Sequence, residues 1–209
     1  MKLVKYIRNF KRLKRRFRLL IIVGVVVVVY FVFKKKLYIP QVAINDVNSM
    51  TGELVNDSAF NAKVNQVADD LGIQANWLLA CMYLESSLNP SARNSASGAT
   101  GLIQFMPATA ISLGTTVDAL YSMDAVTQMD YVEAYLKPYA SKMVSFVDVY
   151  LSIFYPAAVG QAPDYIIGAA GGAVASENAA YQDADGNVTP ASIEAVITER
   201  VNNANFNVS

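Results

Sequence analysis

The sequence contains no histidine and only one cysteine, Cys81. The absence of histidine excludes Ser-His-Asp and Cys-His catalytic groups and the usual zinc sites that contain histidine. A single cysteine cannot form a disulfide within the chain, so cysteine usage does not distinguish an oxidising from a reducing compartment. Because Cys81 lies inside an apolar stretch, we expect a buried, unreactive thiol. Catalysis by this chain would have to use carboxylates, hydroxyls, amides or tyrosines.

Positive charge is scarce outside the N-terminal segment. The chain has 17 Lys and Arg and 17 Asp and Glu, which gives a formal net charge of zero. Residues 1–36 contain 12 of the basic residues and no acid, so residues 37–209 contain all 17 acids and only 5 bases (17 − 12). An acidic body disfavours nucleic acid as a substrate. The basic segment 1–18 predicts contact with anionic lipid headgroups or with nucleic acid.

Residues 19–33 form one long apolar run, LLIIVGVVVVVYFVF, between Arg18 and Lys34. A helix of this length would span about 22 Å, and the flanking cations can snorkel to match the roughly 30 Å hydrocarbon core. We therefore expect residues 19–36 to be a transmembrane anchor with flanking lysines. A cleaved signal peptide is the alternative, but lysines 34–36 occupy the region where cleavage would occur, and no clear small-x-small site follows.

The cations are distributed unevenly on the two sides of this run. Nine of the 12 precede it and three follow it. The positive-inside rule then predicts a single-pass protein with its N-terminus inside and its body outside, on the periplasmic side. In a phage virion with an internal membrane, the same asymmetry would direct the basic segment toward the genome.

The rest of the chain predicts a polar stalk over residues 37–57 and one domain over residues 58–209. Turn-forming residues such as Pro40 and Gly52 interrupt the stalk. Apolar periodicity, capping residues and prolines predict a mostly helical domain with a small extended element at 100–105, an α+β fold that is predominantly α-helical. The expected helices cover residues 58–71, 74–87, 107–114, 124–137, 141–155 and 189–201.

A carboxylate, Glu85, ends the apolar stretch WLLACMYLESSLNP. Apolar neighbours disfavour its ionised form, and the negative end of the helix dipole repels a carboxylate, so both effects raise its pKa. An acid that stays protonated near neutrality suits general acid catalysis. The simpler interpretation is that Glu85 is the first solvated residue after a buried helix.

The residues after Glu85 carry a specific pattern. Glu85-Ser86 is followed by Asn89-Pro90 and then by SGATGLIQFMPATA at 97–110. This stretch resembles the lytic transglycosylase branch of the lysozyme-like superfamily, which has goose-type lysozymes as relatives. The resemblance covers about residues 58–165. It implies a lysozyme-like transglycosylase domain that cleaves the β-1,4 bond between N-acetylmuramic acid and N-acetylglucosamine without a cofactor or metal.

The same resemblance implies roles for particular residues. Glu85 would be the catalytic acid and base, and the substrate-binding candidates are Gln104, Tyr155, Ser86, Ser97, Gly98 and Met106. A glycine at 98 lets the backbone approach a bulky glycan, and the Gln104 amide can bind hydroxyl and acetamido groups. Alternative roles are a loop-stabilising hydrogen bond for Gln104 and packing for Met106 and Tyr155.

The family usually carries Ala-Tyr-Asn-Ala-Gly farther along the chain. The corresponding stretch here is IFYPAAVG, in which Tyr155 matches but Pro156 replaces the asparagine. This Tyr-Pro pair is similar to phage-borne members of the group. The departure leaves the expected fold in place but removes the asparagine that the family has beside this tyrosine.

The segment 178–201 includes DADGNVT, which is similar to an EF-hand calcium loop. With Gly186 at the sharp-turn position, Tyr181 and Ser192 occupy the first and last ligand positions. The register that begins at Asp183 loses the central glycine. We therefore expect a degenerate loop that acts as a turn and helix cap.

Together, these features predict a membrane-anchored peptidoglycan lytic transglycosylase. Its partners would be peptidoglycan glycan strands and, through residues 19–33, a lipid bilayer. Phage entry or exit is the favoured setting, and a secretion or conjugation apparatus is the other. One alternative is a hydrolytic lysozyme, for which Asp118, Asp124 or Asp130 would have to supply a second carboxylate. The other is a non-catalytic wall-binding anchor.

Overall fold

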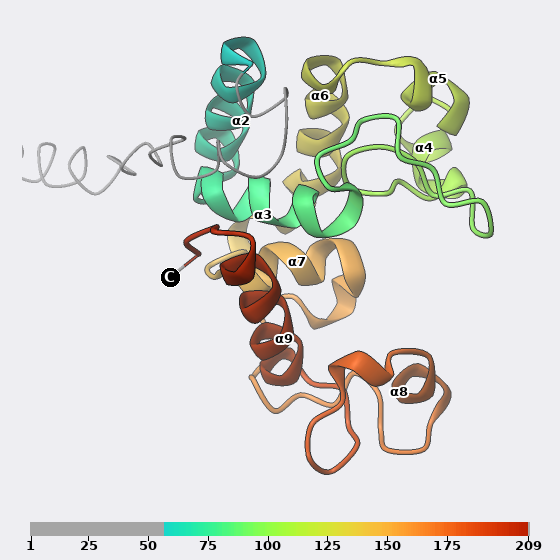
Figure 1. Cartoon of the computed structure of the whole chain (residues 1–209), viewed down its shortest axis with the longest axis vertical. Helices are drawn as coiled ribbons and strands as arrows, with labels where there is room; N and C mark the ends of the chain where they lie inside the picture. Colours follow the sequence, from blue (N-terminus) through green and yellow to red (C-terminus); the bar gives the residue numbers. More distant parts are fainter. Residues whose placement is uncertain (1–56, 209) are drawn as a thin grey trace, which may run out of the picture. The chain divides into compact units, whose positions relative to one another are not determined.

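The computed structural model describes residues 57–208, which belong to one compact unit (Figure 1). The predicted basic segment, the membrane anchor and residues 37–56 of the stalk lie outside the described residues. The helices are α2 (Ser58–Leu71), α3 (Ala75–Ser86), α4 (Pro107–Ser112), α5 (Val117–Ser122), α6 (Ala125–Leu136), α7 (Phe146–Phe154), α8 (Ala173–Glu177) and α9 (Pro190–Asn203), with 3-10 turns at Lys137–Lys142, Pro156–Ala158 and Ala179–Tyr181. Within residues 57–208, no helix is long and apolar enough to cross a bilayer.

The predominantly helical prediction is confirmed, but the extended element expected at 100–105 is wrong. This segment forms turns, and its pairing is limited to isolated bridges such as Thr100 with Phe105. Gly101 has φ 87° and Gln104 has φ 52°, so the chain reverses within a few residues. A left-handed backbone at these positions cannot continue a strand.

Most helix boundaries follow from local capping chemistry. The expected bounds of α2, 58–71, are confirmed. Gly72, with φ 69°, ends the helix, and Asp57 caps its start, because the Asp57 carboxylate accepts hydrogen bonds from two amides of the first turn. Asp124 caps α6 by accepting from the Thr127 amide. The helix expected at 141–155 is shorter. It begins after Ser145, whose hydroxyl caps it.

The apolar helix α3 lies at the centre of the domain. It packs against α2 on one side and against α7 and α9 on the other (Figure 1). Leu78, Ala80, Cys81 and Met82 have no exposed surface, which confirms the expected burial of the thiol. A helix that is apolar on all faces has to be surrounded by other elements. This central position brings its C-terminal end, with Glu85, to the middle of the domain.

The C-terminal tail after α9 packs against α3. Phe206 and Val208 are buried, and the Phe206 ring lies 5.1 Å from the ring of Tyr83. The Trp77 indole donates a hydrogen bond to the Val208 carbonyl at 3.0 Å, and the Asn76 amide donates to the Asn207 carbonyl. The last residues described therefore fix the position of the central helix.

The segment similar to an EF-hand loop is a tight turn that leads into α9, as expected. One oxygen of Asp183 accepts hydrogen bonds from the amides of Asp185 and Asn187, both at 2.9 Å. Thr189 then caps α9 in a reciprocal capping box with Ser192. Among the described residues, no group of three or more acidic or cysteine side chains could hold a metal ion.

Candidate active site

Glu85 lies in the last turn of α3, where the helix ends because Ser87 and Leu88 adopt φ of 53° and 61°. Its side chain is only partly exposed, and burial raises its pKa from 4.5 to about 7. Within residues 57–208, no hydrogen bond or ion pair reaches its carboxyl group. The group can therefore donate or accept a proton near neutrality without first breaking a contact within the protein.

The charge of Glu85 affects three other ionisable side chains. Burial is the main reason that the pKa values of Cys81, Tyr135 and Tyr150 are raised, and the charge of Glu85 raises all three further. Cys81 lies one turn earlier on α3, whereas the tyrosines come from α6 and α7. The Tyr150 and Tyr181 hydroxyls form a hydrogen bond of 2.7 Å. Glu85 is thus bordered by neutral phenol and thiol groups, and burial next to them disfavours its charge.

Tyr135 has a second role, which depends on a proline. Its hydroxyl donates to the Ser152 carbonyl at 3.0 Å. In an uninterrupted helix this carbonyl would accept from the amide four residues later, but that residue is Pro156, which has no N–H. The Tyr135 hydroxyl supplies the missing donor. The proline that departs from the expected motif is therefore compensated by a tyrosine from another helix.

The glycine-rich block 97–106 is attached to the end of α3. The Ser86 hydroxyl lies 2.9 Å from the carbonyls of both Met82 and Leu102 and so connects the helix to the block. The Gln104 amide nitrogen donates to the Gly101 carbonyl at 3.0 Å and to the Ala92 carbonyl at 3.3 Å. The Gln104 Oε1 atom has no hydrogen-bond partner among the described residues, so it can accept one from a substrate.

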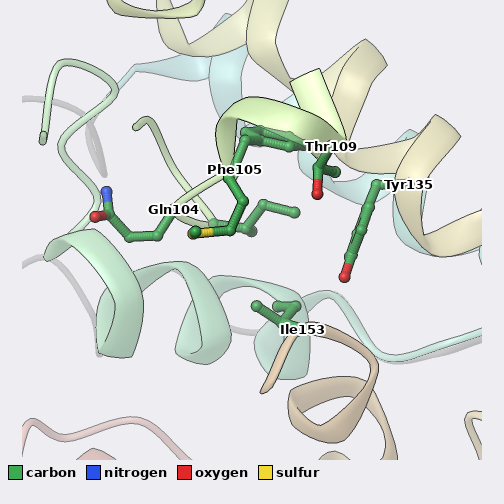
Figure 2. Close-up of a pocket in the computed structure, with 7 residues that line it drawn as sticks. Gln104, Phe105, Thr109, Tyr135 and Ile153 are labelled. Atoms are coloured by element: carbon green, nitrogen blue, oxygen red, sulfur yellow. The ribbon is translucent and has the colours of Figure 1, made fainter. Parts of the chain in front are cut away.

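A pocket of about 40 Å³ lies between this block and the helices α4, α6 and α7. Figure 2 shows Phe105, Thr109, Tyr135 and Ile153 around it, while the end of the Gln104 side chain points away from Tyr135. Its walls are about equally polar and apolar, and Thr109 and Tyr135 are among the residues that line it. Ile103, Gln104 and Met106 complete the lining. Glu85 is not among the residues that line the pocket, but Tyr135 lines it and is affected by the charge of Glu85.

The structure brings some of the expected substrate-binding residues together and leaves others apart. Met106 lines the pocket and is 48% exposed, in agreement with contact to a ligand. The Ser97 hydroxyl accepts a hydrogen bond from the Ala99 amide at 3.2 Å, within the loop itself, and Gly98 occupies a turn with φ 74°. Tyr155 is partly buried against the core and is not among the pocket residues. Substrate contact by these residues stays a prediction.

Five pocket residues were not among the expected substrate-binding residues: Ile103, Phe105, Thr109, Tyr135 and Ile153. Ile103, Phe105 and Thr109 belong to the quoted pattern at 97–110, and Ile153 begins the stretch IFYPAAVG that contains Tyr155, so these four residues had a local signal. Tyr135 had only a weak one: it lies on α6 between Tyr131 and Tyr139, one turn from each. Such spacing is ordinary for a packed helix face.

Comparison with known families agrees with this arrangement. The family model of the Transglycosylase SLT domain matches residues 62–142, which include Glu85, the glycine-rich block and Tyr135. This match supports the grouping of that stretch with the lytic transglycosylases of the lysozyme-like superfamily, and so a glycan-cleaving activity with peptidoglycan as substrate. No curated protein matches the chain.

Proposed function

We propose that the protein is a peptidoglycan lytic transglycosylase in which Glu85 is both the acid and the base. The observation that carries the proposal is the partly buried carboxyl group of Glu85, whose pKa is raised to about 7 by burial. Protonated Glu85 would donate its proton to the glycosidic oxygen between N-acetylmuramic acid and N-acetylglucosamine, and the muramic acetamido group would stabilise the cationic centre. Glu85 would then remove the proton of the C6 hydroxyl, which closes a 1,6-anhydro ring.

The downstream carboxylates favour this reaction over hydrolysis. A hydrolase would need a second carboxylate to activate water. Asp118 is paired with Arg93 at 2.9 Å and Asp130 with Lys63 at 2.6 Å. Asp124 caps α6. Each of the three candidates thus has another partner, whereas a transglycosylase needs only one glutamate.

We further propose that the enzyme acts from a membrane. The apolar run 19–33 would anchor it, and the excess of cations before that run would keep the N-terminus inside and the catalytic domain outside. The basic segment 1–18 would contact anionic lipid or, in a virion, nucleic acid. The Tyr155-Pro156 pair favours a phage, in which the enzyme would open the wall locally during entry or exit.

One product analysis separates the three candidate functions. Purified full-length protein in mild detergent is incubated with sacculi, and the released muropeptides are analysed by mass spectrometry. Anhydro ends are expected for the transglycosylase, whereas reducing ends would indicate a lysozyme and no release would indicate a wall-binding anchor. Glu85→Gln should abolish release, and Glu177→Gln, which changes an exposed glutamate on α8, should retain it.

The rate should also depend on pH in a defined direction. Because the first step needs the protonated form of Glu85, the rate of anhydro-product formation should fall as pH rises through about 7. Initial rates measured from pH 5 to pH 9 test this. A rate that stays constant across this range would show that Glu85 is not the proton donor.

A further inference from the structure

Gln128 on α6 is the only glutamine among the fully buried residues of the described chain, and every polar atom of its side chain is used. Its oxygen accepts from the Leu102 amide at 2.9 Å. Its nitrogen donates to the carbonyls of Pro90 at 2.6 Å and Leu120 at 2.8 Å. A primary amide has two N–H donors, and both are satisfied here. One side chain therefore joins the loop after α3, the glycine-rich block and the end of α5.

The Leu102 backbone is held from two sides. Its amide is bound by Gln128, and its carbonyl accepts from the Ser86 hydroxyl at 2.9 Å. Ser86 is the residue next to Glu85, and Gln104 is two residues after Leu102. The two hydrogen bonds therefore set where the block that carries Gln104 lies relative to the end of α3 that carries Glu85.

The neighbouring glycine fits the same arrangement. A Cβ atom at Gly101 would lie 2.5 Å from the Gln128 oxygen and 3.2 Å from its amide carbon. A contact that short would force the amide away from Leu102. At Gly98, which also has a positive φ, the nearest atom would be the Pro107 Cγ at 3.4 Å, an ordinary contact. Alanine substitutions at Gly98 and Gly101 therefore separate the effect of backbone strain, which both have, from displacement of the Gln128 amide, which only the substitution at Gly101 causes.

We propose that Gln128 is a positioning residue for glycan cleavage: it holds the glycine-rich block in register with the end of α3, so that Gln104 and Glu85 act on the same sugar. This inference rests on the proposed function. Gln128 itself does not touch substrate. Its side chain provides the hydrogen-bond partner of the Leu102 amide and of the Pro90 carbonyl, so its loss leaves these two backbone groups without a partner among the described residues. The Leu120 carbonyl keeps a second donor, the Met123 amide at 3.1 Å.

The test compares Gln128→Met, which keeps length without hydrogen bonds, with Thr189→Ala, which removes the cap of α9 away from the site. Both should lower the melting temperature. Measured below the melting temperature of each variant, kcat/KM on sacculi should fall about 10- to 100-fold for Gln128→Met and by less than about twofold for Thr189→Ala. Equal losses in the two variants would show that Gln128 acts only through stability.

A double variant gives a readout that general stability does not affect. If Gln128 acts by placing Gln104, then Gln104→Ala should reduce kcat/KM much less in the Gln128→Met background than in the native protein. Fully additive effects on the logarithm of kcat/KM would overturn the proposal. If Gln128→Met does not fold, Gly101→Ala replaces it, because its Cβ displaces the same amide.

An exchange measurement keeps this inference separate from the proposed function. The Leu102 amide should exchange with solvent about 10-fold or more faster in Gln128→Met and Gly101→Ala than in the native protein. Gly98→Ala, which adds similar backbone strain, should leave Leu102 exchange unchanged. Fast exchange with no glycan cleavage by the native protein would overturn the proposed function, and unchanged Leu102 exchange would overturn the role of Gln128.

Discussion

At the scale of single residues, Glu85 combines burial of its carboxyl group with the lack of a hydrogen-bond or ion-pair partner within residues 57–208. Its ionised form has no hydrogen bond or ion pair within residues 57–208, and its neighbours Tyr135 and Tyr150 are neutral phenols whose own pKa values are raised. A carboxylate in this position destabilises the fold once it loses its proton. The same property lets it hold a proton near neutrality, as the proposed function requires, so under that proposal stability and function are opposed at this residue.

This opposition predicts how stability depends on pH. The folded pKa of Glu85 is about 7 and the unfolded value is 4.5, so between these values the folded state holds a proton that the unfolded state has lost. The stabilising contribution of the protonated Glu85 side chain is fully present below pH 4.5. It is lost as pH rises to about 7, which lowers the free energy of unfolding by about 3 kcal/mol. Glu85→Gln removes the titrating carboxyl group and with it this pH-dependent loss. The stability of the variant relative to the native protein should therefore increase from pH 5 to pH 8.

Urea denaturation of both proteins at the two pH values measures this difference. Glu177→Gln is the matched control, because it removes a carboxyl group at an exposed position. A difference between native protein and Glu85→Gln that is the same at pH 5 and pH 8 would contradict the raised pKa.

Tyr135→Phe tests the phenol beside Glu85. The substitution keeps the ring and removes the donor to the Ser152 carbonyl, which has no replacement because of Pro156. We expect a loss of about 1 kcal/mol of stability and a lower rate of glycan cleavage, since a polar group is lost from the pocket lining. Tyr139→Phe, on the adjacent turn, should change neither by a comparable amount. If the Tyr135→Phe protein has native stability and a native rate, the Tyr135 hydroxyl supports neither the fold nor glycan cleavage.

At the scale of elements, the central helix α3 depends on the C-terminal tail. Phe206 is 2% exposed and packs against Tyr83, two residues before Glu85. Next to it, Val208 accepts a hydrogen bond from Trp77, the only tryptophan in the chain. The tail and the carboxyl group of Glu85 are therefore connected through one helix.

Phe206→Ala should destabilise the fold by about 3 kcal/mol, because it removes a large buried side chain and leaves a cavity. The fluorescence of Trp77 should shift to longer wavelength as the tail loosens and water reaches the indole. Thermal denaturation followed by tryptophan emission measures both effects. Asn203→Ala, at the exposed end of α9, is the control. If emission and melting temperature match those of the native protein, the tail does not support α3.

At the scale of the whole molecule, charge is divided between the two parts of the sequence. The first 36 residues carry 12 cations and the remainder carries an excess of 12 acids (17 − 5). A negative body would be repelled by an anionic membrane surface, whereas a basic segment would be attracted to it. The apolar run between them is the part that would enter the bilayer.

We expect the full-length protein to sediment with liposomes and to remain bound in high salt, since an apolar span is not released by screening. A form that lacks residues 1–36 should stay in the supernatant. Liposomes with and without anionic lipid separate the contribution of the basic segment from that of residues 19–33. Release of the full-length protein by salt alone would show that the apolar run does not span the membrane.

Local signals in the sequence predicted much of this domain. The caps at Asp124 and Thr189 and the stop at Gly72 depend on side chains within a few residues, so the bounds of several helices could be predicted. The position of Glu85 at the end of an apolar helix predicted the direction of its pKa shift. The short helices α5 and α8 were missed, because they contain only 6 and 5 residues and carry no clear period.

The sequence by itself determined the longer helices, the buried thiol, the acid at the end of α3 and the family that its glycine-rich block resembles, because these depend on neighbours along the chain. Only the tertiary structure decided that Tyr135 compensates for Pro156, that Gln128 holds the Leu102 amide, and that Phe206 supports α3. Each of these contacts joins residues separated by 17 or more positions, such as 26 between Leu102 and Gln128. Helical periodicity indicates which face of a helix is buried but does not identify the partner from another helix, so these contacts could not be predicted from the pattern alone.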